Sequence, residues 1–209
     1  MDSVKMPEPV KPGKRELTRL RNQQAILSAA RECFAQKGYE QVTVRDIISK
    51  TNLASGTFYN YFTDKESIFR AILDDYLKGL DQKLIALQET AKTLDERIYA
   101  AYLALFLAIA DDPLLYELAH DNHRAIRDLY DSNLLGQAFQ SLEQEIVAAM
   151  AEGRIPEANV KYITASFFGV AYEMGLAVAR QVPDEPEEAA RVAAALFLGG
   201  LKEVAKLTN

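Results

Sequence analysis

The 209-residue sequence contains a single cysteine, Cys33, and only two histidines. One cysteine cannot form an intramolecular disulfide, which fits a protein of the reducing cytoplasm. No apolar run approaches the roughly 20 residues that span a bilayer, so we expect no transmembrane helix. The polar, charged and proline-containing stretch from Met1 to Leu20 lacks the pattern of a signal peptide. We therefore expect a soluble cytoplasmic protein that does not associate with membranes.

Motifs that support catalysis are also missing. The sequence has no glycine-rich phosphate-binding loop and no Ser-His-Asp arrangement. Glu117 and His120 have the spacing of two metal ligands on one helix face, but there is no cysteine nearby to complete a metal site. Polar contacts to an anionic head group, or an exposed helix end, are the alternatives for this stretch. We expect no enzymatic activity, no cofactor and no metal.

Alternating strand-like patterns are absent as well, and apolar residues recur at spacings of three and four along the whole chain. The sequence therefore predicts an all-α fold. Caps of the Thr-x-x-Asp or Thr-x-x-Glu type are expected to begin three of its helices, at Thr43, Thr63 and Thr93. The helices are expected at about residues 17–37, 44–51, 55–61, 63–89, 93–110, 113–120, 122–152, 157–181 and 185–207.

Positive charge is concentrated at one end of an acidic chain. Residues 1–73 carry 12 Lys and Arg against 8 Asp and Glu, which gives a net charge of +4. The whole chain has a net charge of −6, so residues 74–209 carry −10. This asymmetry is expected when one end of a protein meets phosphate groups, although chance clustering is an alternative for so modest a charge. We predict a flexible basic arm at 1–15, a DNA-binding domain at 16–64 and a ligand-binding and dimerisation domain at 65–209.

The two short helices around Asn52 have the spacing of a helix-turn-helix, whose second helix enters the DNA major groove. Ile47, Ile48, Leu53 and Phe58 are expected to form its small core. A solvated helical corner is the alternative, but its exposed face would more often carry Glu and Lys. The residues left facing outward are small or form hydrogen bonds, which suits contact with bases and phosphates: Ser55, Gly56, Thr57, Tyr59, Asn60 and Tyr61.

Residues 26–73 resemble the N-terminal domain of TetR-family transcriptional repressors. The matching features are the A-x-x-x-F-x-x-x-G-Y stretch from Ala30 to Tyr39, the T-V-R-D-I opening of the second helix, the G-T-F-Y-N-Y-F recognition helix and the D-K-E start of the fourth. The resemblance implies a homodimer that binds a palindromic DNA operator and is released by a small-molecule effector. An activator, or a regulator of the same fold that needs no ligand, is the alternative.

The resemblance also implies a role for each matching residue. Thr43 is expected to cap the second helix and touch a phosphate, and Arg45 to contact a guanine. The expected base contacts come from Ser55, Gly56 and Thr57, and phosphate contacts from Tyr59, Tyr61 and Lys65, with Asn60 beside them. A surface salt bridge to Asp46 or Glu40 is the alternative for Arg45, and packing against the first helix is the alternative for Tyr61. The arm's basic residues, with Arg19 and Arg21, could reach flanking phosphate or remain solvated.

The C-terminal two-thirds of the chain should then provide dimerisation and sensing. Small residues in 157–207 allow close helix approach in a homodimer: Ala165, Gly169, Ala171, Gly175, Ala193, Ala194, Gly199 and Gly200, around Phe197. An interior helix pair would use the same residues and is the alternative. Aromatic residues could line a pocket for a lipophilic effector, although for each of them a plain core position is the alternative. The predicted ligand-binding residues are Tyr76, Tyr102, Phe106, Arg124, Phe139, Phe168 and Tyr172.

Overall fold

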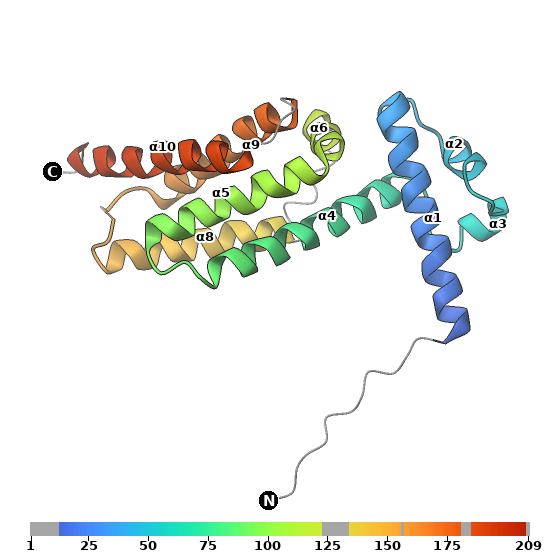
Figure 1. Ribbon diagram of the computed structural model, residues 1–209, viewed down its shortest axis with the longest axis horizontal. Coiled ribbons are helices and arrows are strands. Elements are labelled where there is room, and N and C mark those ends of the chain that lie inside the picture. Colours follow the sequence, from blue (N-terminus) through green and yellow to red (C-terminus); the bar gives the residue numbers. More distant parts are fainter. Residues whose placement is uncertain (1–12, 123–133, 156, 181–184, 208–209) are drawn as a thin grey trace, which may run out of the picture. The chain divides into compact units, whose positions relative to one another are not determined.

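The computed structural model describes residues 13–122, 134–155, 157–180 and 185–207, and these form α-helices without a β-strand (Figure 1). The prediction of an all-α fold is confirmed. In chain order the helices are α1 (Lys14–Lys37), α2 (Val44–Ser49), α3 (Ser55–Phe58), α4 (Lys65–Gln88), α5 (Leu94–Asp111), α6 (Pro113–Asp121), α8 (Leu134–Ala151), α9 (Val160–Arg180) and α10 (Pro186–Leu207).

Two of the three expected helix caps are present. The Thr43 and Thr93 side chains each accept a hydrogen bond from the backbone N–H three residues on, and Asp46 and Glu96 reach back to the cap residue. The third prediction was wrong, because Asp64 rather than Thr63 caps α4. The Ser67 N–H donates to Asp64 Oδ1 at 2.7 Å, and the Asp64 N–H donates to Ser67 Oγ at 3.3 Å. Asp and Thr are both good N-cap residues. The sequence therefore could not decide between Thr63 and Asp64, and the backbone path at the start of α4 does.

Helix α1 begins earlier than the sequence pattern indicated. Lys14 and Arg15, assigned to the flexible arm, form its first turn after Gly13, and residues 1–12 lie outside the described part of the chain. Lys, Arg and Glu are strong helix formers, so the helix extends beyond its apolar stripe. Helix α3 is shorter than expected, since it ends at Phe58 and continues to Tyr61 as a turn.

The described residues from Gly13 to Ile68 form one compact unit, and the described residues from Phe69 onward form a second. In the first unit the side chains of Phe34, Ile47 and Phe58 are at most 1% exposed. Two ion pairs join α1 to α2, one between Lys37 and Asp46 and the other between Lys50 and Glu32. The boundary between the units falls inside α4, four residues beyond the predicted domain boundary. The assignment of functions to the two parts stays a prediction.

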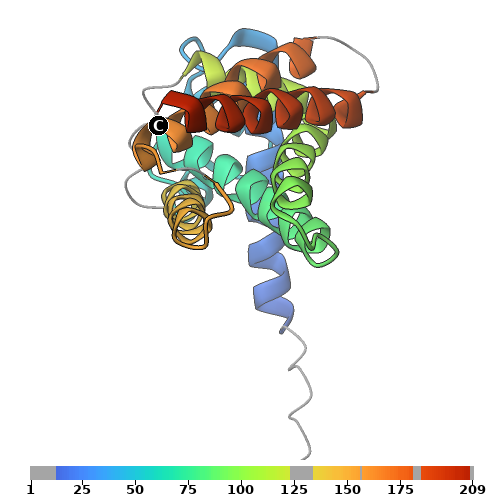
Figure 2. The same ribbon diagram turned by 90° about the vertical axis from the view of Figure 1, so that its left-hand side faces the viewer.

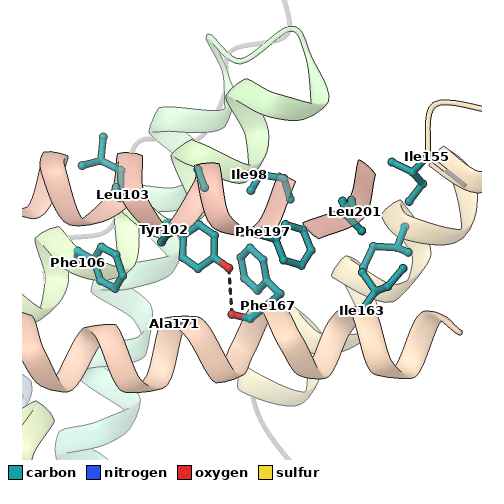
Figure 3. Close-up of a cluster of buried hydrophobic side chains, with 14 of the residues drawn as sticks. Ile98, Tyr102, Leu103, Phe106, Ile155, Ile163, Phe167, Ala171, Phe197 and Leu201 are labelled. Atoms are coloured by element: carbon teal, nitrogen blue, oxygen red, sulfur yellow. Dashed lines mark hydrogen bonds between the residues drawn. The ribbon is translucent and has the colours of Figure 1, made fainter. Parts of the chain in front are cut away.

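The second unit is built around α5, α9 and α10. Helix α10 packs along α5 and α9, and both views show α10, in red, beside α9, in orange (Figures 1 and 2). At the centre, the Tyr102 ring stacks on Phe167 with centroids 4.4 Å apart, and Phe197 meets Phe167 edge-on at 5.3 Å (Figure 3). The buried Tyr102 hydroxyl donates to the Phe167 carbonyl oxygen at 3.2 Å. This hydrogen bond satisfies the one polar atom of the ring.

Among the described helices, α9 is long and apolar enough by composition to cross a membrane. Helices α5 and α6 meet the same criterion only if they are counted as one span, which would be bent by 101°. Ile163, Phe167 and Ala171 of α9 are buried in the core of the second unit. Helix α9 also contacts α5, α6, α8 and α10. Its apolar composition is therefore explained by packing against these helices.

Candidate functional site

The turn between α2 and α3 is held by one side chain. The Thr51 hydroxyl donates to the Ile48 carbonyl oxygen at 2.9 Å and accepts the Leu53 N–H at 3.3 Å. Below it, Ile47 and Phe58 are fully buried. Thr51 was not among the predicted residues, although threonine commonly forms local hydrogen bonds to the backbone in turns. Its two hydrogen bonds fix the direction in which α3 leaves α2.

One face of α3 and the turn after it is open to solvent. Ser55, Gly56 and Asn60 are exposed, Tyr59 is 56% exposed, and Thr57 is half-buried. A Cβ built on Gly56 would meet nothing within 4 Å. Packing within the protein therefore does not require glycine at this position. A glycine on an exposed recognition surface does permit close approach of another backbone, such as that of DNA.

Arg45 projects from the start of α2 and is exposed. Neither alternative salt bridge is formed in the described part of the chain, because Asp46 is engaged by Lys37 and by Thr43. The hydrogen bonds from Lys37 and Thr43 hold the pKa of Asp46 well below its usual range. The Asp46 carboxylate is thus committed to the helix cap and to α1. The Arg45 guanidinium remains available to a partner.

Thr43 and Tyr61 already take part in hydrogen bonds. The Thr43 hydroxyl donates to Asp46 Oδ2 at 2.6 Å, so a phosphate would have to share it. The half-buried Tyr61 hydroxyl accepts a hydrogen bond from Asn22 Nδ2 of α1 at 3.2 Å. Packing against the first helix, the alternative for Tyr61, is therefore present. Because this bond uses Tyr61 as the acceptor, its own proton can still be donated to a phosphate.

Lys65 has a structural role that the sequence did not reveal. Its Nζ donates to the carbonyl oxygens of Tyr39 at 2.8 Å and Glu40 at 3.1 Å, and lies 4.5 Å from the centroid of the Tyr39 ring. These contacts tie the start of α4 to the segment that follows α1. Two of its three protons are used, so the predicted phosphate contact depends on the third.

Comparison with known proteins agrees with this geometry. Residues 26–72 match the model of the bacterial regulatory proteins of the tetR family. The transcriptional repressor KstR2 of Mycolicibacterium smegmatis is 29% identical over 104 residues, which are 50% of this chain and 51% of that protein. The fatty acid degradation regulator FadR of Bacillus halodurans has the same fold, with a TM-score of 0.73 at 21% identity over 92% of this chain and 98% of that one.

Residues 26–72 form a DNA-binding domain of the TetR-family type. Bacillus subtilis FadR, solved in complex with stearoyl-CoA, has the same fold, with a TM-score of 0.68 at 21% identity over 85% of this chain and 98% of that one. The TetR-family match lies in the N-terminal third, and the chain spans about half the length of KstR2, the curated relative compared.

The described members of the predicted ligand-binding set do not form one group. Tyr102 and Phe106 are fully buried in the core, and Phe168 packs against it. Tyr76 and Tyr172 are half-buried, and the Tyr172 ring stacks on His120 of α6. Arg124 and the side chain of Phe139 lie outside the described residues. None of the other five lines the hollow of about 580 Å³ between α5 and α8, whose described border consists of Lys92, Thr93, Leu94, Arg97, Glu145, Ala148 and Arg154.

The small residues expected at the TetR-family dimer interface divide between two environments. Ala165, Gly169, Gly199 and Gly200 are exposed. In contrast, Ala171, Gly175, Ala193, Ala194 and Phe197 are buried inside the protomer, so for these five the alternative of an interior helix pair holds. The exposed side of α9 and α10 also carries large apolar side chains, with Tyr162 74%, Val192 44% and Leu196 61% exposed.

Replacing Lys65 by Ala should lower the free energy of unfolding by about 1–2 kcal/mol, because hydrogen bonds from a charged donor to two carbonyls are lost. Lys78→Ala is the matched control, since Lys78 is exposed on the same helix, and it should change stability by less than about 0.5 kcal/mol. Urea unfolding followed by circular dichroism measures both. A Lys65→Ala protein of wild-type stability that binds every duplex more weakly would instead assign Lys65 to phosphate alone.

Proposed function

We propose that this protein is a transcriptional repressor that binds a palindromic DNA operator as a homodimer and leaves it when a lipophilic effector binds. The observation that carries the proposal is the exposed Arg45 of α2, which forms no salt bridge with a described residue, together with the exposed face of α3. A helix of this kind, positioned by a short turn, presents its side chains to the major groove. Arg45 is suited to bidentate hydrogen bonding with a guanine.

The roles of the other residues follow from their hydrogen-bonding capacity. We assign base contacts to Ser55, Gly56 and Thr57, whose small side chains allow close approach. We assign phosphate contacts to Tyr59, Tyr61 and Lys65, with Asn60 beside them, and a shared contact to Thr43. Phosphate contacts set the position of the protein on DNA, and base contacts select the sequence.

Arg45→Ala should weaken binding to the selected operator by about 1–3 kcal/mol, because a bidentate base contact is lost. Arg45→Lys retains the positive charge but loses the planar guanidinium that can donate two parallel hydrogen bonds to one base. This variant should lose the preference for the base pair that Arg45 contacts, and its binding should keep the salt dependence of the wild type. The measurement is fluorescence anisotropy with a duplex selected from a random pool by the wild-type protein, over a salt series.

The outcome with random-sequence duplex provides the control. Affinity for random duplex should fall much less than affinity for the selected site, because Arg45 reads a base. An equal loss on both duplexes would reassign Arg45 to phosphate. A wild-type protein that binds no duplex at low salt would contradict the repressor proposal as a whole.

We infer that the homodimer forms through the exposed faces of α9 and α10, within residues 157–207. Exposed apolar side chains next to exposed glycines give a face on which two helix pairs can approach closely. A two-fold dimer presents two copies of α3 to two half-sites, which matches a palindrome. The protein would act in the cytoplasm, without enzymatic activity and without a cofactor.

For the effector we propose a long-chain acyl thioester or a molecule of similar lipophilicity. The support is the largely apolar interior of the second unit and the stearoyl-CoA bound by Bacillus subtilis FadR, which has the same fold. Helix α4 begins at Lys65 in the first unit and continues to Gln88 in the second. A ligand that displaces α4 would change the separation of the two recognition helices. A coupling of about 1–3 kcal/mol changes operator affinity about 5- to 150-fold.

A further inference from the structure

One stripe of residues runs along the face of α1 that packs against the core of the first unit. Ile26 and Ala30 belong to this stripe, and both are fully buried. Residues three or four apart share a face of an α-helix, so the stripe continues toward the N-terminus through Asn22, Arg19 and Arg15. The same face of α1 is therefore apolar in its second half and basic in its first turns.

The hydrogen bond between Asn22 and Tyr61 marks the point at which this stripe leaves the core. Asn22 Nδ2 donates to the Tyr61 hydroxyl oxygen at 3.2 Å, and both side chains are half-buried. Residues 13–21, which come before Asn22, are all exposed. Figure 1 shows these first turns of α1, in blue, extending past α3. No described part of the first unit covers Arg15 or Arg19.

The exposed turns of α1 carry mainly positive charge. Residues 13–22 contain four Lys or Arg and a single acidic residue, Glu16. Arg15 and Arg19 form no hydrogen bond or ion pair with a described residue, Glu16 included. A helix face that is simply solvated usually carries charges of both signs, often paired at spacings of three or four. Two arginines on one face without a described partner are better suited to a polyanion.

Arg15 and Arg19 are aligned with a residue of the proposed DNA-binding surface. Tyr61 accepts the hydrogen bond from Asn22, so its own proton can be donated to a phosphate. Arg15 lies seven residues before Asn22, which corresponds to about 10 Å along the helix axis. Successive phosphates of one DNA strand are about 3.4 Å apart along the duplex axis. The stripe can therefore follow the DNA backbone for about three base pairs beyond the phosphate at Tyr61.

We propose that Arg15 and Arg19 bind backbone phosphates of the DNA that flanks each half-site, outside the base pairs contacted by α3 and Arg45. The inference rests on the proposed function, because it extends the DNA-binding surface of the same domain. Guanidinium groups form charge-assisted, bidentate hydrogen bonds with phosphate. Phosphate contacts carry no sequence information, so these contacts add affinity without changing the preferred operator sequence.

The test compares the wild type with Arg15→Gln/Arg19→Gln on two forms of the selected operator duplex. In one form every phosphate is charged, and in the other the phosphates of about three base pairs beyond each end of the selected site are replaced by neutral methylphosphonates. Fluorescence anisotropy should show that the wild type binds the charged duplex at least about tenfold more tightly than the neutralised one. The double variant should bind the two duplexes alike, because it lacks the groups that contact the flanks.

The salt dependence provides a second readout. The slope of log affinity against log salt concentration on the charged duplex should decrease by about 0.9 for each phosphate contact that the double variant loses. Arg15→Lys/Arg19→Lys retains both charges and should retain most of the wild-type slope. Gln is about as good a helix former as Arg, so circular dichroism and urea unfolding should show a folded protein of wild-type stability.

Arg21→Gln is the matched control. Arg21 is an exposed arginine of the same helix turns, but it lies about 100° around the helix from Asn22 and therefore outside the stripe. This variant should still prefer the charged flanks as the wild type does. A loss as large as that of the double variant would overturn the inference, because it would indicate an effect of net charge rather than of one face of α1.

The outcomes separate this inference from the proposed function. A wild type that binds the charged and neutralised duplexes equally would overturn the inference, as would a double variant that keeps the full preference for charged flanks. In both cases the repressor proposal would stand if Arg45→Ala still weakened binding to the selected site more than to random duplex. A wild type that binds no duplex would overturn both.

Discussion

Leu196→Glu should convert the protein from a dimer to a monomer. Leu196 is 61% exposed in the protomer and lies on α10 near Val192, which is 44% exposed. A carboxylate placed in a dry interface without a partner costs several kcal/mol, whereas the same carboxylate on a free protomer remains in water. An isolated protomer reaches only one half-site, so operator affinity should fall by about a hundredfold, equivalent to ~3 kcal/mol.

Leu114→Glu is the control for this experiment. Leu114 is a leucine of α6 that is 62% exposed, so the chemical change and the initial exposure match those of Leu196. It should remain dimeric and bind operator as the wild type does. Multi-angle light scattering at micromolar concentration gives the mass of each variant, and circular dichroism verifies folding. A dimeric Leu196→Glu protein, or a wild type that is monomeric, would contradict the proposed interface.

The dimer prediction also illustrates what sequence patterns leave undetermined. Small residues occur on all sides of α9 and α10, so composition alone could not distinguish Gly199, which is exposed, from Ala193, which is fully buried. The distinction depends on which face of α10 packs against α5 and α9. Phe197 shows the consequence, since a charge introduced there would enter the protomer core and would not test dimerisation.

Local chemistry, in contrast, was predicted well from the sequence. The caps at Thr43 and Thr93 need only a hydroxyl and a carboxylate three residues apart, and both are present. The contacts that could not be predicted join distant segments. Asn22 and Tyr61 are 39 residues apart, and Lys65 reaches carbonyls 25 and 26 residues earlier. The motif shows which residue types occur, but only the packing of α1 and the start of α4 determines their partners.

Tyr102→Ala should lower the free energy of unfolding by about 3–5 kcal/mol, the range for truncating a buried aromatic ring. From the sequence, Tyr102 was a candidate to line an effector pocket. In the structure it is fully buried, with its ring between Phe106, Phe167 and Phe197. Figure 3 shows Tyr102 among Phe106, Phe167 and Phe197, so its removal would leave a cavity between α5, α9 and α10. The expected result is a less stable protein rather than one with altered effector affinity.

Tyr102→Phe separates the two contributions of this side chain. It retains the ring and removes only the hydroxyl that donates to the Phe167 carbonyl oxygen, so the loss should be about 1 kcal/mol. Urea unfolding of the three proteins should therefore give a graded series, with the alanine variant far below the phenylalanine variant. If Tyr102→Ala were as stable as the wild type and yet bound a lipophilic effector differently, the ring would line a binding site after all. The core assignment predicts the opposite, because the stacked and edge-on contacts of Tyr102 are all made to residues of the protomer itself.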